Sequence, residues 1–432
     1  MAEKHFPPSG GGERGGGQAV LVAVKTPEMT DESVMESLSE LERLLETAGG
    51  NAVLKVTQAR ENPDKRTYIG KGKSEEIADF IKSEGGVSLV VFNDELTPSQ
   101  IKNLENLLGV RVIDRTMLIL DIFALRASTA EGKLQVEIAC LRYTSPRLTG
   151  HGREMSRLGG GIGTRGPGES KLETDRRHIR QRIGLLNEKL LKLEKSREIM
   201  RKGRESSLLP TVAIAGYTNA GKSTLLNYLT QAGVLAEDKL FATLDPTTRV
   251  INLPGGLEAL LTDTVGFIDR LPTHLIKAFR STLDELKYAD AVVCLVDSSE
   301  PDAERSRKRS VTEKLVKEIA GGDKSVVWCY NKRDKEIDVD FIPPDAVRVS
   351  SVTGEGMDEL LVKIKDALKK DRVSLNFFFP HSKAAEMYGL LQRAAVKTKE
   401  TTDEGVFISA ECPKEFAGRY KAFVSNNLKK PD

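Results

Sequence analysis

Residues 211–230 read TVAIAGYTNAGKSTLLNYLT, which is an apolar β-branched run, then a glycine-rich loop, then a leucine-rich run. The middle of this segment, GYTNAGKS from Gly216 to Ser223, has the spacing GxxxxGK[ST]. In such a loop the backbone amides and the following helix N-terminus point at phosphates, the lysine adds positive charge, and the last hydroxyl can ligate magnesium. Because the loop lies between a predicted strand and a predicted helix, it predicts a phosphate site in an α/β domain.

Further along the chain, β-branched strands are predicted at 257–262, 291–297, 325–331 and 346–351, and two of them end in polar motifs. DTVG begins at Asp263, whose carboxylate can hold magnesium through water, while the Gly266 amide can bind a γ-phosphate. NKRD ends at Asp334, which can accept hydrogen bonds from the ring N–H and the amine of guanine. The order of the motifs therefore predicts GTP as the nucleotide.

Two further segments of the same domain complete the predicted site. Residues 240–249 read LFATLDPTTR, in which a threonine can close over magnesium and γ-phosphate and be released after hydrolysis. Thr243, Thr247 and Thr248 are the candidates, and the pattern does not choose among them. SSV at 350–352 lies at the end of the last strand and supplies the remaining contact on the base side.

The region before this domain has two parts. From residue 18 to about 126, apolar β-branched runs alternate with amphipathic ones, which predicts a small parallel α/β domain after a disordered tail at 1–17. Next, apolar residues recur at heptad spacing on both sides of the glycine-rich stretch 158–168, which predicts an antiparallel helical hairpin with that stretch at its tip. The heptad positions are Leu134, Ile138, Leu141, Leu148, Ile179, Ile183, Leu186, Leu190 and Leu193.

Charge is concentrated in this hairpin. Between residues 142 and 204 there are 17 Lys and Arg against 7 Asp and Glu, a net charge of +10 in a chain whose total is +2. A basic hairpin without stacking aromatics predicts recognition of RNA phosphates and RNA shape, although a solvated pair of charged helices would look similar. The candidate RNA contacts are Arg153, Arg157, Arg165, Lys171, Arg176 and Arg177.

Composition limits the remaining classes. No run of about 18 apolar residues is present, so a membrane span is not predicted. The first residues lack the apolar middle of a secretion signal. The four cysteines lie far apart without metal-ligand spacing, which predicts reduced and mostly buried thiols in a cytosolic protein.

The motifs in this order resemble the GTPase domain of the translation-factor-related class, and FATLDPTT followed by DTVGF resembles its Obg-HflX branch. GGGIGTRGPGES at 159–170 and YIGKGK at 68–73 resemble the HflX family, and the similarity extends from residue 18 to about 410. The resemblance implies a GTPase that binds the large ribosomal subunit and its rRNA and splits or recycles stalled ribosomes, with weaker use of ATP in some members. It also implies Mg²⁺ as cofactor, GTP and GDP as substrate and product, no DNA partner, a monomer, and a cytoplasmic protein with a membrane-associated fraction.

The predicted fold class is α/β. It comprises a P-loop GTPase domain with a doubly wound, mostly parallel sheet at 208–372, preceded by a small α/β domain at 18–127 with a long helical hairpin at 128–207. A small α+β domain at 373–432 follows it.

The motifs predict roles residue by residue, and the resemblance selects Thr243 as the switch threonine that binds magnesium. The predicted catalytic residues are Lys222, Thr243 and Gly266, and the predicted magnesium site is Ser223, Thr243 and, through water, Asp263. The predicted nucleotide contacts are Gly216, Tyr217, Thr218, Asn219, Ala220, Gly221, Lys222, Ser223, Thr224, Phe241, Ala242, Thr243, Leu244, Asp245, Asp263, Thr264, Val265, Gly266, Asn331, Lys332, Arg333, Asp334, Ser350, Ser351 and Val352.

The sequence also predicts a slow enzyme. Many small GTPases place a glutamine after DTVG to orient the attacking water, and here the residue is Phe267. Hydrolysis by the isolated protein should therefore be slow and stimulated by ribosomes, with Arg249 or Arg270 as candidates for a charge supplied in cis. Asn219 stands where some relatives hold potassium, so stimulation by K⁺ is a further hypothesis.

Two other functions remain open from the sequence. A tRNA-modifying GTPase would end in a CxGK motif, whereas the last cysteine here, Cys412, lies in ECPKE. A regulatory GTPase that recruits a membrane protease or another protein partner is the other alternative, and the basic hairpin disfavours it.

Overall fold

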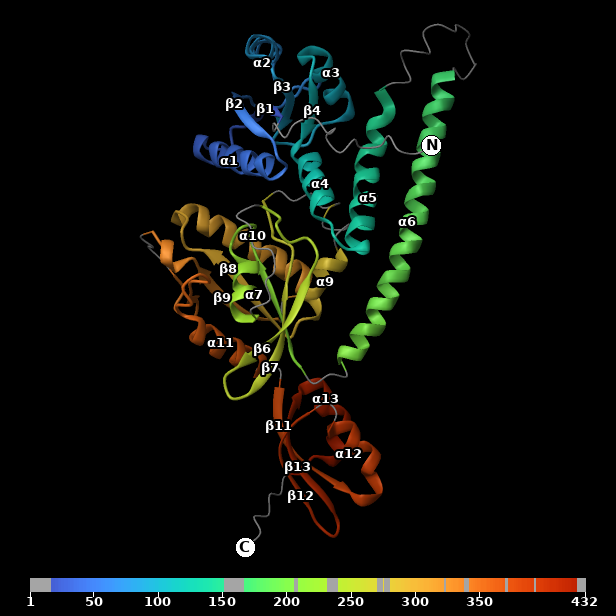
Figure 1. Cartoon of the computed structure of the whole chain (residues 1–432), viewed down its shortest axis with the longest axis vertical. Coiled ribbons are helices and arrows are strands. Elements are labelled where there is room, and N and C mark those ends of the chain that lie inside the picture. The colour runs from blue at the N-terminus through green and yellow to red at the C-terminus, as the bar shows by residue number, and fades with distance from the viewer. Residues whose placement is uncertain are drawn as a thin grey trace. The chain divides into compact units, whose positions relative to one another are not determined.

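The computed structural model describes residues 17–150, 167–205, 209–230, 240–269, 275, 280–321, 324–337, 342–369, 372–391 and 394–425. The chain separates into two compact units (Figure 1). The first comprises residues 1–125 and 136–185, and the second comprises residues 126–135 and 186–432.

The first unit contains a four-stranded parallel sheet in the order β2-β1-β3-β4. Its strands are β1 (Gln18–Lys25), β2 (Asn51–Ala59), β3 (Val87–Phe92) and β4 (Arg111–Asp114). The connecting helices are α1 (Asp31–Thr47), α2 (Lys71–Glu84) and α3 (Pro98–Leu108), and α4 (Arg115–Arg126) follows the last strand. Thr97 begins α3 with a reciprocal cap to Gln100, which satisfies amides that the first helical turn leaves unpaired.

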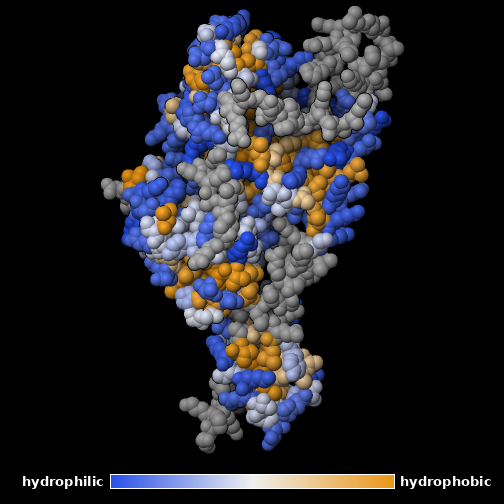
Figure 2. Space-filling model, viewed as in Figure 1, coloured by the Kyte–Doolittle hydropathy of each residue, from blue (hydrophilic) through white to orange (hydrophobic). Residues whose placement is uncertain are grey.

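The predicted hairpin is present as two long helices. α5 (Ala130–Thr144) continues into a short 3₁₀ turn, Ser145–Gly150, and α6 spans Pro167–Glu205. Within the first unit the two helices run antiparallel (Figure 1), and Arg182 of α6 pairs with Glu137 of α5 at 2.8 Å. Among the heptad positions of α6, Leu186 is buried and the other four are half-buried. In Figure 2 the surface of these helices shows hydrophobic residues next to hydrophilic ones.

The second unit contains a six-stranded sheet in the order β10-β9-β8-β5-β7-β6, parallel except for β6. Its strands are β5 (Thr211–Gly216), β6 (Thr247–Leu253), β7 (Leu257–Asp263), β8 (Ala291–Asp297), β9 (Ser325–Asn331) and β10 (Val347–Arg348). The helices are α7 (Lys222–Thr230), α9 (Arg280–Tyr288), α10 (Asp302–Ala320) and α11 (Met357–Lys369).

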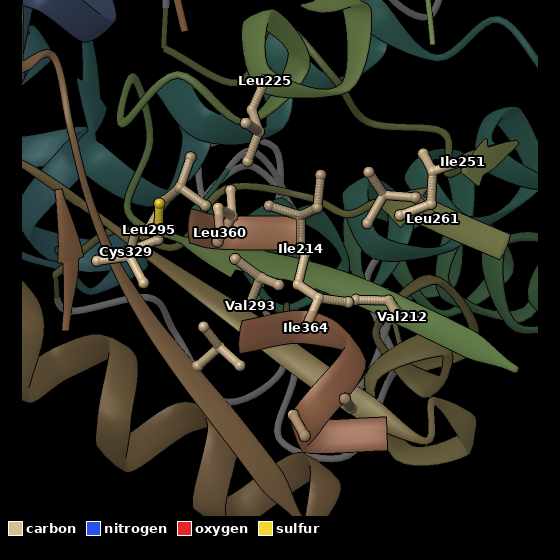
Figure 3. Packing of buried hydrophobic residues seen from close by; sticks show 14 of the residues in the cluster. Val212, Ile214, Leu225, Ile251, Leu261, Val293, Leu295, Cys329, Leu360 and Ile364 are labelled. Carbon is tan, nitrogen blue, oxygen red and sulfur yellow. The ribbon is translucent and has the colours of Figure 1, made fainter. Parts of the chain in front are cut away.

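Apolar side chains cover both faces of this sheet. On one face Val212, Ile214 and Val293 pack against residues of α7 and α11 such as Leu225 and Leu360 (Figure 3). On the other face Ala213, Ala215 and Cys294 pack against α9 and α10. Helices on both faces of a mostly parallel sheet make the doubly wound arrangement, so the predicted fold class is confirmed.

The last part of the second unit is a three-stranded antiparallel sheet in the order β11-β13-β12. It is formed by β11 (Arg372–Pro380), β12 (Ala395–Thr401) and β13 (Gly405–Pro413), with α12 (Ala384–Leu391) and α13 (Lys414–Arg419). Phe377 and Phe379 are buried, and Phe379 stacks on Phe423 with ring centroids 4.7 Å apart. This sheet with its helices agrees with the predicted α+β segment.

Two predictions from composition can be compared with the structure. All four cysteines are buried and none forms a disulfide bond, as predicted. No helix among the described residues is long and apolar enough to cross a membrane.

Candidate functional site

The loop between β5 and α7 surrounds the buried end of a lysine side chain. Lys222 is 6% exposed, and its ammonium donates to the carbonyl oxygens of Gly216 at 3.2 Å and Tyr217 at 2.9 Å. Burial lowers the pKa of Lys222 to about 8, although the nearby Asp263 carboxylate opposes that shift. A buried ammonium held by neutral carbonyls is suited to receive an anion.

A cavity of about 50 Å³, open to solvent, lies beside this lysine. Three segments that are distant in the sequence form it: the glycine-rich loop with the start of α7, the segment 241–243, and Gly266. The residues that line it are Thr218, Asn219, Gly221, Lys222, Ser223, Thr224, Phe241, Ala242, Thr243 and Gly266. All ten were predicted as nucleotide contacts.

The three predicted magnesium ligands lie together at one end of this site. The Ser223 hydroxyl donates to the Asp263 carboxylate at 2.7 Å and lies 2.7 Å from the Thr243 hydroxyl. Asp263 is fully buried, and burial raises its pKa. Its second oxygen, Oδ1, has no hydrogen-bond partner among the described residues. Two hydroxyls and a carboxylate with an unpaired oxygen are the hard donors that Mg²⁺ prefers, so these residues fit the ion.

Gly266 allows a close approach between DTVG and the phosphate loop. A Cβ atom at this position would lie 2.9 Å from Lys222 Nζ and 2.8 Å from the Thr218 side chain. Because real Cβ contacts are essentially never below 3.0 Å, any other residue would push the two segments apart. The glycine therefore keeps its own amide next to the lysine that would face the phosphate.

The predicted base-binding residues form a second cluster, which Asn331 connects to the phosphate loop. Its amide donates to the Ala220 carbonyl at 2.9 Å, and its carbonyl accepts from the backbone amide and hydroxyl of Ser351 at 3.0 and 2.8 Å. Ser350 donates to the Asp334 carboxylate at 2.6 Å. Asn331 thus fixes the loops that present Asp334.

Several predicted nucleotide contacts have side chains directed elsewhere. Leu244 and Val265 are buried, and the Thr264 hydroxyl donates to the Ile214 carbonyl at 2.7 Å. The Tyr217 hydroxyl accepts the Asp269 amide at 2.6 Å. Arg333 pairs with Glu355 at 3.2 Å, and the Val352 side chain is 74% exposed. For these positions the motif fixes the backbone path, and the neighbouring core or loop takes the side chain.

Asp245 is the clearest case of a side chain outside the cavity. Its carboxylate accepts hydrogen bonds from Ser128 and Thr129. Burial would raise the pKa of Asp245, but these hydroxyl and amide donors lower it below its ordinary value. The sequence predicts a nucleotide contact at Asp245, and in this structure both of its carboxylate oxygens are bound within the protein instead.

The three threonine candidates are now separated. Only the Thr243 hydroxyl reaches the cavity, whereas the Thr248 hydroxyl lies 2.9 Å from that of Thr262 on the neighbouring strand. Thr247 begins β6, outside the cavity lining. Phe267 is 1% exposed and packs in the sheet core. Arg249 donates to the Thr248 carbonyl, and Arg270 lies outside the described residues.

Sequence reasoning missed three residues that bind predicted members of this site. Asp297, at the end of β8, pairs with Lys332 at 2.7 Å, and Ser128 with Thr129 binds Asp245. The sequence did contain a signal for Asp297, because it is an aspartate at the end of an apolar predicted strand, where polar site residues gather. No local pattern marks Ser128 and Thr129, because their contact with Asp245 spans more than 100 residues.

The candidate RNA contacts are only partly described. Arg153, Arg157 and Arg165 lie outside the described residues, as does the side chain of Lys171. Arg177 is exposed on α6, and Arg176 is half-buried beside it.

Comparison with known proteins agrees with the site geometry. Residues 35–124 match the family "GTP-binding GTPase N-terminal", residues 126–204 match "GTP-binding GTPase Middle Region", and residues 211–332 match "50S ribosome-binding GTPase".

Individual relatives match most of the chain. A GTPase HflX from Lacrimispora saccharolytica is 49% identical over 92% of this chain and 94% of its own length. The GTPase HflX from Caldanaerobacter subterraneus is 47% identical over 94% of each chain. Among solved structures, a GTP-binding protein from Sulfolobus solfataricus in complex with GDP is 24% identical over 82% of this chain and 99% of its own, with a TM-score of 0.43.

Proposed function

The chain belongs to the HflX family of GTPases and hydrolyses GTP, and from this premise we propose that it binds the large ribosomal subunit and splits or recycles stalled ribosomes. The proposal joins two properties of the molecule. One is a nucleotide site in the second unit, and the other is the basic helical hairpin.

In this proposal each residue of the cavity has a definite task. Lys222 and the amides of the phosphate loop bind the phosphates, and the Gly266 amide binds the γ-phosphate. Ser223, Thr243 and, through water, Asp263 would hold Mg²⁺, which when bound neutralises charge on the phosphate oxygens. Asp334, oriented by Ser350, selects guanine.

The same site accounts for slow hydrolysis by the protein alone. The Phe267 side chain is buried and apolar, so it cannot orient an attacking water by hydrogen bonding. Among the described residues that line the cavity, Lys222 carries the only positive side-chain charge. We propose that a ribosomal group completes the site and stimulates hydrolysis.

The observation that carries the ribosome proposal is the charge of the hairpin. A net +10 between residues 142 and 204, in a chain of +2, leaves the remainder net acidic. Counterion release from RNA phosphates would drive binding by this segment, with strong dependence on salt. Arg176 and Arg177 are the described members of the predicted RNA contacts.

The proposal includes four finer points. The protein acts as a cytoplasmic monomer, touches RNA and no DNA, accepts ATP more weakly than GTP, and responds to K⁺ through Asn219. Asn219 lines the cavity. Its φ of +63° is left-handed, so the phosphate loop turns sharply at this residue. Equal hydrolysis rates in sodium and potassium buffers would remove the potassium point.

The test is sedimentation of vacant ribosomes through sucrose gradients with the protein and a non-hydrolysable GTP analogue. The wild type should convert whole ribosomes into subunits and co-sediment with the large one. The double variant Arg176→Ala with Arg177→Ala should bind more weakly at moderate salt. Lys189→Ala with Lys192→Ala, an equal loss of charge at exposed positions farther along α6, is the matched control.

One outcome would overturn the proposal, and a second would overturn the assignment of the contact residues. If the wild type neither binds nor splits ribosomes, the GTPase serves a protein or tRNA-modification partner instead. If both double variants lose the same amount of binding, general charge and not the predicted contact region drives association.

A further inference from the structure

The segment that carries Thr243 is tied to the first turn of α5 by one carboxylate. Asp245 Oδ2 accepts from the Ser128 amide at 3.0 Å, the Ser128 hydroxyl at 2.6 Å and the Thr129 amide at 2.9 Å. Its other oxygen, Oδ1, accepts from the Thr129 hydroxyl at 2.5 Å. Four donors on one carboxylate make a strong charge-assisted contact, and all of these residues belong to the second unit.

Thr129 is at the same time the cap of α5. Its hydroxyl accepts the Gly132 amide at 2.9 Å, and its carbonyl accepts the Lys133 amide at 3.0 Å. The carboxylate of Asp245 therefore lies at the amino-terminal end of a helix, where negative charge is stabilised by the helix dipole.

The contact also depends on the lack of a side chain at Gly132. A Cβ atom there would lie 2.6 Å from Asp245 Oδ1, below any normal contact distance. The first turn of α5 thus has room for the carboxylate because this position is glycine.

Asp245 stands two residues after Thr243, whose hydroxyl lies 2.7 Å from that of Ser223 in the cavity. Between them, Leu244 is buried with 3% of its surface exposed. The two residues after Thr243 are therefore held in place, Leu244 by packing and Asp245 by the four hydrogen-bond donors.

We propose that Asp245 is a positioning residue for GTP hydrolysis: by binding the cap of α5 it holds Thr243 in the nucleotide cavity. This inference rests on the proposed role of Thr243 and does not depend on the ribosome. By linkage, a nucleotide state that favours Thr243 in the cavity also favours the contact with α5, and the converse holds equally.

The test compares affinities for fluorescent GDP and for a fluorescent non-hydrolysable GTP analogue, together with the single-turnover rate of GTP hydrolysis. Asp245→Ala removes the acceptor. Thr129→Asp keeps a good helix cap but places a second carboxylate against Asp245. Each should lower affinity for the GTP analogue by about 5- to 150-fold, the usual size of such couplings, while GDP affinity changes little.

The double variant Thr129→Asp with Asp245→Asn reverses the polarity of the contact, because the new amide can donate to the new carboxylate. It should recover most of the loss. Lys133→Ala, an exposed neighbour in the same turn, is the matched control and should behave as wild type.

Three results would overturn the inference: unchanged GTP-analogue affinity in both single variants, an equal loss for both nucleotides, or no recovery in the double variant. Thr243→Ala separates the inference from its premise. If Thr243→Ala retains wild-type hydrolysis, the premise fails; if it loses hydrolysis while the Asp245 and Thr129 variants do not, the positioning role alone fails.

Discussion

Asp114 in the first unit and Asp263 in the second are fully buried aspartates that each end a strand, and they differ in how their carboxylates are hydrogen-bonded. In the first unit Asp114 ends β4, and its carboxylate accepts from the amides of Leu96 and Met117 at 3.1 and 3.0 Å. It also accepts from the Tyr143 hydroxyl and, at 3.1 Å, from the Arg147 guanidinium. In the second unit Asp263 ends β7, and one of its oxygens is buried with no partner among the described residues.

A lysine near each sheet also differs from the other, in burial and in whether its partner is charged. Lys25, at the end of β1, pairs with Asp31 at 2.6 Å and is partly exposed. Lys222 is buried and faces only backbone carbonyls in the hydrogen bonds that its ammonium donates. An unpaired buried carboxylate oxygen costs free energy unless a bound group satisfies it, and a cation would do so at Asp263. Both sheets share the α/β topology, so the pairing of these two carboxylates, and not the topology, distinguishes the candidate site from the structural aspartate.

The largest expected effect is on the stability of the first unit. Asp114→Ala leaves the buried Tyr143 hydroxyl and the Arg147 guanidinium without their carboxylate, so the free energy of unfolding should fall by about 3–5 kcal/mol. Urea unfolding followed by exposure of the buried Cys140 thiol measures this loss in the first unit. GTP affinity measured below the unfolding transition should stay near wild type, and a variant as stable as wild type would contradict the assignment of Asp114 as structural.

The next effect is on hydrolysis. Lys222→Ala removes the buried ammonium, so the rate of GTP hydrolysis should fall by about 10²–10³-fold, the usual cost of losing one preorganised charge. The nucleotide-free variant should unfold at the same temperature as wild type or higher, because burial disfavours the charged lysine and lowers its pKa. Lys25→Ala is the matched control with unchanged hydrolysis. A Lys222 variant that loses stability and hydrolysis together would indicate a structural lysine.

A smaller change is expected from Asp334→Asn. The Asp334 carboxylate can accept hydrogen bonds from both guanine donors. An asparagine amide offers one acceptor and one donor, and this pair matches xanthine, which has a carbonyl where guanine has its exocyclic amine. GTP affinity should fall by about 10- to 100-fold and affinity for xanthosine triphosphate should rise, as measured by competition with a fluorescent nucleotide. Asp358→Asn, an exposed change on α11, should leave both affinities unaltered. Parallel loss of both nucleotides would mean that the loop, and not the base contact, was damaged.

The sequence predicted the positions of the site better than it predicted how their side chains are satisfied. The loop from Gly216 to Ser223 and the aspartate of DTVG carry spacing rules that depend only on local backbone, so their place at strand ends followed directly. Asp114 also ends a short strand, and nothing in RVID distinguishes it from Asp263. The distinction depends on Tyr143 and Arg147, which reach it from about 30 residues away.

The same limit explains Asp245. FATLDPTT places it next to the switch threonine, which predicts a nucleotide contact, but its carboxylate faces Ser128 and Thr129. Contacts between residues so far apart in the sequence depend on the tertiary structure, which local hydrophobic periodicity does not predict. The fold class, which depends on local patterns repeated along the chain, was predictable for the complementary reason.

The smallest expected effect concerns Asp121, seven residues after Asp114. It lies half-buried on α4, and desolvation raises its pKa despite the attraction of Arg111. A carboxyl group with a raised pKa in the folded state stabilises the fold below its unfolded pKa of 3.8, and that stabilisation is lost as the pH rises through the folded value. At pH 7 the buried charge therefore lowers the free energy of unfolding.

Asp121→Asn should raise the free energy of unfolding at pH 7 by at most about 1 kcal/mol, with the difference vanishing below pH 4. Urea unfolding at both pH values measures it, with the exposed change Asp79→Asn as control. If Asp121→Asn instead destabilised the first unit at pH 7, the charged carboxylate would have to be stabilised by donors in the folded state, as that of Asp114 is. Asp121 would then be a structural carboxylate like Asp114.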